Sequence, residues 1–193
     1  DESMVVRRCL IRNNLGAFNG GPGAISTFGN TTARIEDCLI AENTAGHQQA
    51  GAMVINWMTR VVGCTIANNI SGPDQFPNGL PFNDGAVYFR PFIGPIYMAQ
   101  EESFSNNIVW GNVDADGNPT AIATQGTVPL VVEHSIVEGG YIGVGNLALD
   151  PQFVDAAAGD YRLQPGSPAI DAGNSAVNRN DLDIVRDPRS LYG

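Results

Sequence analysis

The stretch that decides the fold is Val6-Arg7-Arg8-Cys9-Leu10-Ile11-Arg12-Asn13-Asn14, because four later stretches follow the same pattern. In each, an apolar residue is followed after three positions by Cys, Asn or Ser, two positions later by Ile or Val, and three positions after that by Asn or Gly. The later copies are residues 35–43, 61–69, 104–112 and 132–140. The steps between copies are 29, 26, 43 and 28 residues. A period of about 20 to 50 residues is typical of repeat architectures.

The spacing within one copy predicts two short strands joined by a bend. Apolar positions spaced three and then two residues apart, such as Val6, Cys9 and Ile11, fit neither an amphipathic helix nor one uninterrupted strand. The Asn that closes the copy tolerates left-handed backbone angles and suits a sharp corner. A third strand is predicted wherever Gly-Ala precedes an apolar run. These runs begin at Gly23, Gly51 and Gly85.

One such period cannot bury its apolar face alone, but stacked periods can. We therefore predict an all-β fold: a right-handed parallel β-helix (a solenoid) of about five coils over residues 1–140. Residues 141–193 would form a loop-rich C-terminal capping region and tail of the same domain. Stacking would align equivalent residues in columns. The predicted columns are Cys9, Cys38 and Cys64, continued by Asn107 and Ser135, and an Asn ladder of Asn14, Asn43, Asn69 and Asn112.

The three cysteines share one phase of the repeat, so we predict reduced core residues rather than a disulfide. Side chains stacked in phase seldom meet the dihedral angles that a disulfide requires. The redox compartment therefore does not follow from the cysteine count.

The Gly-Ala-apolar starts and the Ile-x-x-Asn closes resemble the paired repeats of polymorphic outer-membrane proteins and, more broadly, bacterial secreted right-handed β-helix proteins. Residues 150–153, Asp-Pro-Gln-Phe, and residues 160–174 resemble the C-terminal region typical of surface-anchored β-helix proteins. The resemblance implies an extracellular or cell-surface location. Proteins of this kind include adhesins, structural surface proteins and polysaccharide-active enzymes. We also expect a truncated chain, because the continuation usual after an Asp-Pro-Arg stretch, here residues 187–189, is missing.

The composition argues against several classes of partner. The chain of 193 residues has a net charge of −10, a pI of about 4.4 and no Lys. Such a surface disfavours nucleic acid and anionic membranes, and it disfavours direct contact with polyuronates unless cations bridge. No apolar run approaches the roughly 20 residues that a membrane span needs.

One stretch has oxygen ligands at alternating positions, as calcium-binding loops do: Asp114, Asp116 and Asn118. Pro119 stands where such a loop needs Gly, and Gln125 stands where it needs a bidentate Glu. Calcium is therefore one hypothesis, and an ordinary solvated turn is the other. No other cofactor is expected.

Ligand contact is predicted at five aromatic residues, because aromatic faces on a ladder of strands can stack on sugar rings. Trp110 follows the inward Val109 and should face outward. Two of the five belong to a Pro- and Gly-rich insertion at a corner, residues 71–84. The five are Trp57, Phe76, Phe82, Tyr88 and Trp110. The alternatives are packing beneath a loop and an interface with a partner.

No catalytic residue is predicted. His134 and Ser135 are adjacent in an extended segment and should point in opposite directions, which does not suit a catalytic pair. Acidic residues are scattered over the phases of the repeat rather than paired across neighbouring coils.

The best interpretation is a non-catalytic extracellular or cell-surface β-helix protein that acts in adhesion, scaffolding or glycan contact. A polysaccharide lyase or hydrolase is the second hypothesis. The third is a structural subunit that self-associates end to end, because no cap precedes Val5 and a bare coil offers unpaired strand edges. The partners implied are a glycan, another surface protein or a second copy of the chain.

Overall fold

The computed structural model describes residues 4–16, 21–28, 32–47, 49–73, 85–90, 104–125 and 129–177. Within these ranges the regular structure is almost entirely strand, and the single helical element is a 3-10 turn at Ala156–Ala158. The fold is therefore all-β, as predicted.

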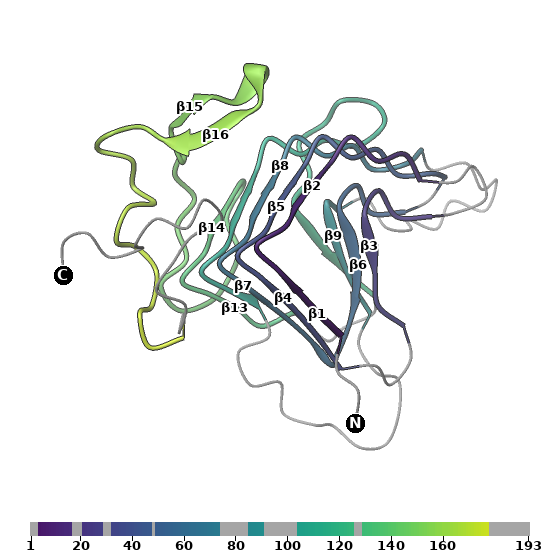
Figure 1. Ribbon diagram of the computed structural model, residues 1–193, viewed down its shortest axis with the longest axis horizontal. Helices are drawn as coiled ribbons and strands as arrows, with labels where there is room; N and C mark the ends of the chain where they lie inside the picture. The colour runs from purple at the N-terminus through teal and green to yellow at the C-terminus, as the bar shows by residue number, and fades with distance from the viewer. Residues whose placement is uncertain are drawn as a thin grey trace.

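Three parallel sheets form the body of the molecule. The first contains β1 (Met4–Arg7), β4 (Ala33–Glu36), β7 (Thr59–Val62), β10 (Phe104–Ser105) and β13 (Val132–Glu133). The second contains β2 (Leu10–Arg12), β5 (Leu39–Ala41), β8 (Thr65–Ala67), β11 (Ile108–Trp110) and β14 (Ile136–Val137). The third contains β3 (Ile25–Ser26), β6 (Met53–Asn56), β9 (Val87–Arg90) and β12 (Ile122–Thr124). Viewed along the stack, equivalent strands nearly eclipse one another around a common interior (Figure 1), which is consistent with a parallel β-solenoid.

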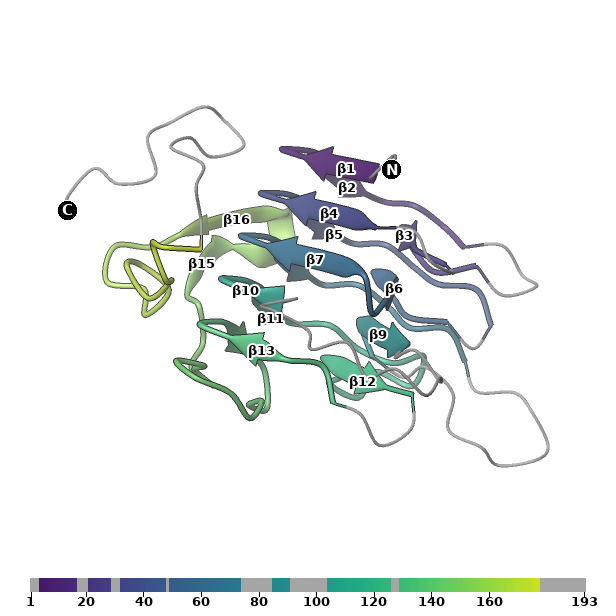
Figure 2. The same ribbon diagram turned by 90° about the horizontal axis from the view of Figure 1, so that it is seen from below.

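Each step of the sequence repeat becomes one step between paired strands. Figure 2 shows the strands of the first sheet stacked in chain order from β1 to β13. The strand partners along the second sheet include Ile11, Ile40, Ile66, Val109 and Val137 in succession. The 43-residue step keeps the same alignment as its shorter neighbours. The predicted parallel stacking of the repeats is thereby confirmed.

The interior is filled by the apolar positions of the repeat. Ile35, Ile40, Met53, Ile66 and Phe89 are fully buried in one continuous cluster. Burying a side chain of this size contributes about 1.5 to 3 kcal/mol relative to leaving it exposed. The three sheets therefore share one hydrophobic core.

A single residue in the left-handed conformation makes each bend between the first and second sheets. These residues are Arg8, Asp37, Gly63, Asn106 and His134, with φ between 48° and 66°. A second series of such residues comes directly before the Asn or Gly that closes each copy, and it consists of Asn13, Glu42, Asn68, Gly111 and Gly139. A left-handed residue costs roughly 1 to 2 kcal/mol when it carries a side chain. The bend residue explains why consecutive apolar residues are three positions apart across the bend and two positions apart after it.

The side chain of the residue after each bend accepts a hydrogen bond from the backbone of the preceding repeat. The backbone N–H of Cys38 donates to Sγ of Cys64 at 3.5 Å, and that of Cys64 donates to Oδ1 of Asn107 at 2.8 Å. The N–H of Asn107 then donates to Oγ of Ser135 at 3.1 Å. Cys, Asn and Ser all carry an acceptor close to Cβ, so the position accepts any of the three. Asn146 extends the series, because its Oδ1 accepts from the N–H of Ser135 at 3.0 Å. Asn146 lies outside the column predicted from the repeat.

The asparagines at the second corner are hydrogen-bonded in series. Nδ2 of Asn14 donates to Oδ1 of Asn43 at 2.8 Å, Nδ2 of Asn43 donates to Asn69 at 2.8 Å, and Nδ2 of Asn69 donates to Asn112 at 2.9 Å. Each accepting oxygen also receives the backbone N–H of the preceding asparagine. Asn43, Asn69 and Asn112 are buried, whereas Asn14 is exposed at the end of the ladder.

A short segment, residues 141–147, lies against the last repeat. Leu147 forms a parallel bridge with Ile136. The backbone N–H groups of His134 and Val137 donate to the carbonyl oxygens of Val144 and Leu147 at 2.8 and 3.0 Å. This segment therefore occupies part of the open edge of the final strands.

The rest of the C-terminal region lies beside the stack. It begins with an antiparallel hairpin of β15 (Phe153–Asp155) and β16 (Asp160–Leu163). Figures 1 and 2 show the hairpin outside the second sheet, alongside the middle of the stack. Further on, Asn174 and Asn106 exchange two hydrogen bonds, at 2.8 and 2.9 Å. This region therefore contacts the flank of earlier repeats rather than extending the stack.

Replacing Asn69 by Ala is expected to lower the free energy of unfolding by about 1 to 3 kcal/mol. The change removes the acceptor of the buried Asn43 N–H, and one unsatisfied buried group costs about that much. Urea unfolding with an unchanged slope would measure the difference. The matched control is Asn14→Ala, which removes the exposed end of the ladder. Equal losses in the two variants would contradict a contribution from the buried ladder.

Native alkylation is expected to label Cys9 and spare Cys38 and Cys64. Cys9 is partly exposed and the other two are buried free thiols. Burial also raises the pKa of the Cys64 thiol, and the thiolate is the reactive form. The hydrogen bond with Cys64 lowers the pKa of Cys38 to about 7, so Cys38 is protected by its burial alone. Mass spectrometry after a short incubation would show one modified site, and all three after unfolding. Labelling of Cys64 as fast as Cys9 would show that the cysteine column is not buried.

Candidate functional site

Small side chains on the outer face of the second sheet make room for the C-terminal hairpin. Arg12, Ala41, Ala67 and Trp110 are paired in register along one outward row. Because two alanines separate the two large side chains, the middle of the row is recessed. Tyr161 of the hairpin fills this recess, where it packs against both alanines and is 8 % exposed.

Two further contacts fix the hairpin on this face. The rings of Phe153 and Tyr161 meet edge to face with centroids 5.3 Å apart. Nδ2 of Asn68 donates to the carbonyl oxygen of Ala156 at 3.2 Å. The hairpin is therefore held through both packing and a hydrogen bond to a corner residue of the stack.

At one end of the row, Tyr161 joins an ion pair. Nη2 of Arg12 lies 2.6 Å from Oε1 of Glu42, and the Tyr161 hydroxyl donates to the same oxygen at 3.1 Å. The Arg12 guanidinium holds the pKa of the Glu42 carboxyl below its ordinary value. Burial, followed by the Glu42 charge, raises the pKa of Tyr161 to about 12. At neutral pH the phenol therefore donates a charge-assisted hydrogen bond to a carboxylate.

At the other end of the row, Trp110 lines a pocket between the sheet and the segments that flank the hairpin. The pocket has a volume of about 290 Å³. Its other lining residues are Asp150, Gln152, Phe153, Ala156 and Gln164. We call it the Trp110 pocket. Three of the six lining residues, Asp150, Gln152 and Gln164, carry polar side chains and are exposed. The two aromatic side chains come from the sheet and from the hairpin.

The polar side of the Trp110 pocket is built around a strained turn. Gln152 has a left-handed φ of 54°, which is unusual for a residue with a side chain. Oδ1 of Asp150 accepts the Gln152 N–H at 2.8 Å, and the Gln152 carbonyl accepts the Gln164 N–H at 2.9 Å. Strained backbone of this kind is common at binding sites, where the surrounding structure maintains it.

Several polar atoms of the pocket remain available. Nε2 of Gln164 donates to the Phe153 carbonyl at 2.8 Å, so Oε1 of Gln164 remains as an acceptor for a ligand. Among the described residues, Oδ2 of Asp150 and the side-chain amide of Gln152 have no hydrogen-bond partner. An indole beside free carboxylate and amide groups suits a small ligand with one apolar face and several hydroxyl groups.

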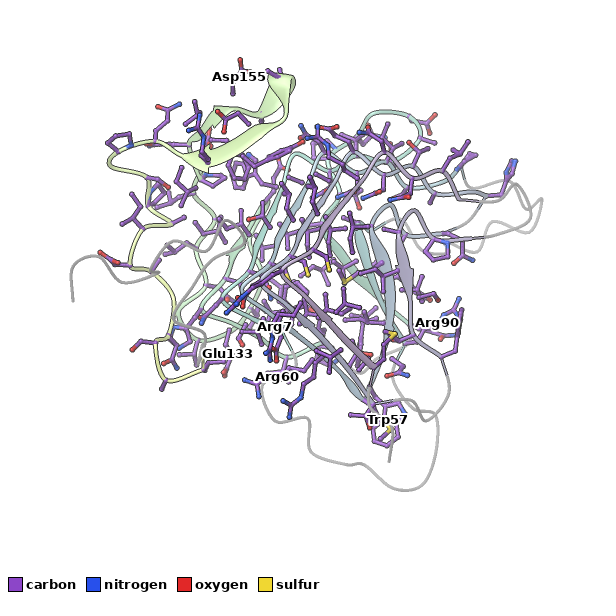
Figure 3. All side chains as sticks on the ribbon, in the orientation of Figure 1. Arg7, Trp57, Arg60, Arg90, Glu133 and Asp155 are labelled. Atoms are coloured by element: carbon purple, nitrogen blue, oxygen red, sulfur yellow. The ribbon has the colours of Figure 1, made fainter. Side chains whose placement is uncertain are left out.

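The other predicted aromatic residues are not gathered at this pocket. Trp57 packs against the core on the side of the molecule opposite Asp155 of the hairpin (Figure 3). Tyr88 is buried with Ala50 and Val54 and lies 5.7 Å from the Arg90 guanidinium. Phe76 and Phe82 lie outside the described residues.

The predicted calcium loop forms a closed turn. Oδ1 of Asp114 accepts the N–H groups of Asp116 and Asn118 at 2.9 and 2.8 Å, and Oδ2 accepts Nδ2 of Asn118 at 2.8 Å. These bonds from Asn118 and the turn hold the pKa of Asp114 below its ordinary value. The carboxylate is thus engaged by its own turn. Across the described ranges, no group of three or more His, Cys, Asp or Glu side chains is placed to hold a metal ion.

A larger hollow of about 870 Å³ lies at the last repeat, between residues 129–133 and 139–144. Its lining is mostly hydrocarbon, and Glu133 and Tyr141 supply its polar side chains. It lacks the several convergent polar groups that orient a ligand. We therefore take the smaller Trp110 pocket as the candidate site.

Sequence reasoning identified Trp110 but missed the residues that surround it. Asp150 and Gln152 belong to the segment that resembles the C-terminal region of surface-anchored β-helix proteins, and Gln164 lies in the predicted loop-rich capping region. The Asp-x-Gln spacing is compatible with a side-chain-stabilised turn. No local signal indicates that this turn lies beside Trp110.

No protein-family model, curated protein or solved structure matches this chain. No helix in the described part of the chain is long and apolar enough to cross a membrane.

The Glu42 contact predicts a dependence of stability on acid pH. Because the folded-state pKa of Glu42 is lowered, its contribution is present above the ordinary value of 4.5 and is lost as pH falls through the lower folded value. We expect the free energy of unfolding to decline less below pH 4.5 in Glu42→Gln than in the parent protein. Urea titrations at successive pH values would measure the slopes. Tyr161→Phe, which keeps the ring and the ion pair, serves as the control for the hydroxyl. Identical slopes in the parent and Glu42→Gln would contradict the assignment.

Proposed function

We propose that this chain is a non-catalytic extracellular or cell-surface protein of bacterial secreted type that contacts glycans through the Trp110 pocket. Its scaffold would be a right-handed parallel β-helix of about five coils. Adhesion or scaffolding would follow from holding the pocket on a rigid stack. The extracellular and bacterial parts of the proposal derive from the resemblance of the repeats and of residues 150–153.

The observation that carries the proposal is the combination of Trp110 with Asp150, Gln152 and Gln164 around one small pocket. A sugar ring has an apolar C–H face and polar edges. The indole can stack on the face, while carboxylate and amide oxygens accept hydrogen bonds from hydroxyl groups. Trp110 is the last residue of β11, an interior strand of the second sheet, and it pairs with Ala67 of β8, so the aromatic surface is held in place.

Binding without turnover fits this pocket better than hydrolysis. Most glycosidases use two carboxyl groups about 5 to 10 Å apart. Asp150 is the single carboxylate among the described residues that line the pocket. Reducing-end and 4,5-unsaturated product assays on the same glycans would test the enzyme hypothesis, and turnover abolished by Asp150→Asn would overturn our choice.

End-to-end self-association has one supporting observation and one opposing observation. Apolar side chains are exposed at the β1 and β2 edge, including Val5 (52 %) and Leu10 (56 %). At the other end, Val144 and Leu147 already hydrogen-bond to the last repeat. Continuous stacking of copies needs an open strand edge at both ends of the solenoid, so we favour glycan contact over end-to-end self-association.

Replacing Trp110 by Ala is expected to weaken glycan binding by at least about fivefold, by analogy with the stacking of a nucleobase on an aromatic side chain, which contributes about 1 to 3 kcal/mol. Isothermal titration calorimetry with a panel of oligosaccharides would measure the affinity. Phe28→Ala is the matched control, because Phe28 is also an exposed aromatic (57 %) and does not line the pocket. Gln152→Ala and Gln164→Ala provide polar variants that leave the packing of the sheet intact. Binding that survives in all three pocket variants would refute the site.

A further inference from the structure

The Trp110 pocket contains one ionisable side chain, and it is acidic. Among the described lining residues, Asp150 carries the charge and the remainder are uncharged. We propose that the pocket binds saccharide rings that have no negative charge and discriminates against uronates. This inference rests on the proposed function and adds the class of sugar to it.

The carboxylate has a free acceptor oxygen. Oδ1 of Asp150 is occupied by the N–H of Gln152, whereas Oδ2 has no partner among the described residues. An ionised carboxylate accepts hydrogen bonds and donates none. It therefore suits the hydroxyl of a neutral sugar and repels the carboxylate that a uronate carries at C6.

No nearby cation offsets this repulsion within the described part of the site. The arginine of the outward row, Arg12, is paired with Glu42 at 2.6 Å. The arginine of the hairpin, Arg162, is paired with Asp160 at 2.6 Å. The chain as a whole carries a net charge of −10, so the wider field has the same sign as Asp150.

The size of the pocket limits the ligand further. Pockets for drug-sized ligands span about 300 to 1,000 Å³. At about 290 Å³, the Trp110 pocket lies just below this range, so we take a single sugar ring rather than a longer oligosaccharide as its occupant. Selection by charge therefore acts on the single ring beside Asp150.

The test compares tetrasaccharides that differ only in oxidation at C6. Cellotetraose, mannotetraose and galactotetraose would each be titrated against the folded chain beside the corresponding tetrauronate. We expect a neutral ligand to bind at least about tenfold more tightly than its acidic counterpart at low ionic strength. Added salt should raise the affinity for the uronate, because it screens the repulsion, and should change neutral binding little.

Asp150→Asn separates charge from shape. Its oxygen can still accept the Gln152 N–H, so the turn is kept. We expect the variant to bind the uronate more tightly and the neutral sugar less tightly than the parent does. Equal affinities for the neutral sugar and its uronate, or tighter binding of the uronate that neither salt nor Asp150→Asn changes, would overturn the inference about charge and leave the proposed glycan binding standing. If none of the six ligands binds the parent protein, the proposed function fails as well.

Discussion

The hydrogen bond from a backbone N–H to the side chain of the equivalent residue in the next repeat fixes the rest of this structure. At the first corner it joins Cys38 to Cys64 and Cys64 to Asn107. At the second it joins Asn43 to Asn69 and Asn69 to Asn112. Both corners need a left-handed residue, which is unfavourable in isolation. The bonds between repeats offset that cost, so the bends persist only where the repeats are stacked in register.

This register also explains why the long step between the third and fourth repeats is tolerated. The step is 43 residues where its neighbours are 26 and 28, yet Phe104 pairs with Val61 and Val109 pairs with Ile66. The entropy of closing a flexible loop rises slowly, by about 0.6 kcal/mol for each doubling of its length. A buried corner bond and a buried aliphatic pair outweigh that increment. Insertions can therefore vary while the corners stay aligned.

The repeat was sufficient to predict the interior of the molecule but not its flank. Val6, Cys9, Ile11 and Asn14 follow one another at fixed intervals, so their partners in later repeats are determined by counting. The hairpin has no such relation to the stack. Tyr161 lies against Ala41 and Ala67 because those side chains are small, and the sequence gives no reason to connect residues so far apart. Likewise, Trp110 could be assigned to the outside of a strand, whereas its neighbours Asp150 and Gln164 could not be identified before the hairpin was placed.

The two ends of the outward row show how one packing arrangement produces both a structural contact and an open site. The hairpin crosses the row over its two alanines, and the larger residues at either end meet it differently. Arg12 is closed off, because Glu42 pairs with its charge and also accepts the hydrogen bond of the Tyr161 hydroxyl. Trp110 meets the strained turn at Gln152, whose backbone is satisfied while its side chain is free among the described residues. Polar groups that the fold itself consumes cannot bind a ligand, so the capacity to bind resides at the Trp110 end. Because that end combines a strand of the stack with a segment from outside the repeat, changes at Asp150, Gln152 and Gln164 can alter the ligand without disturbing the stack.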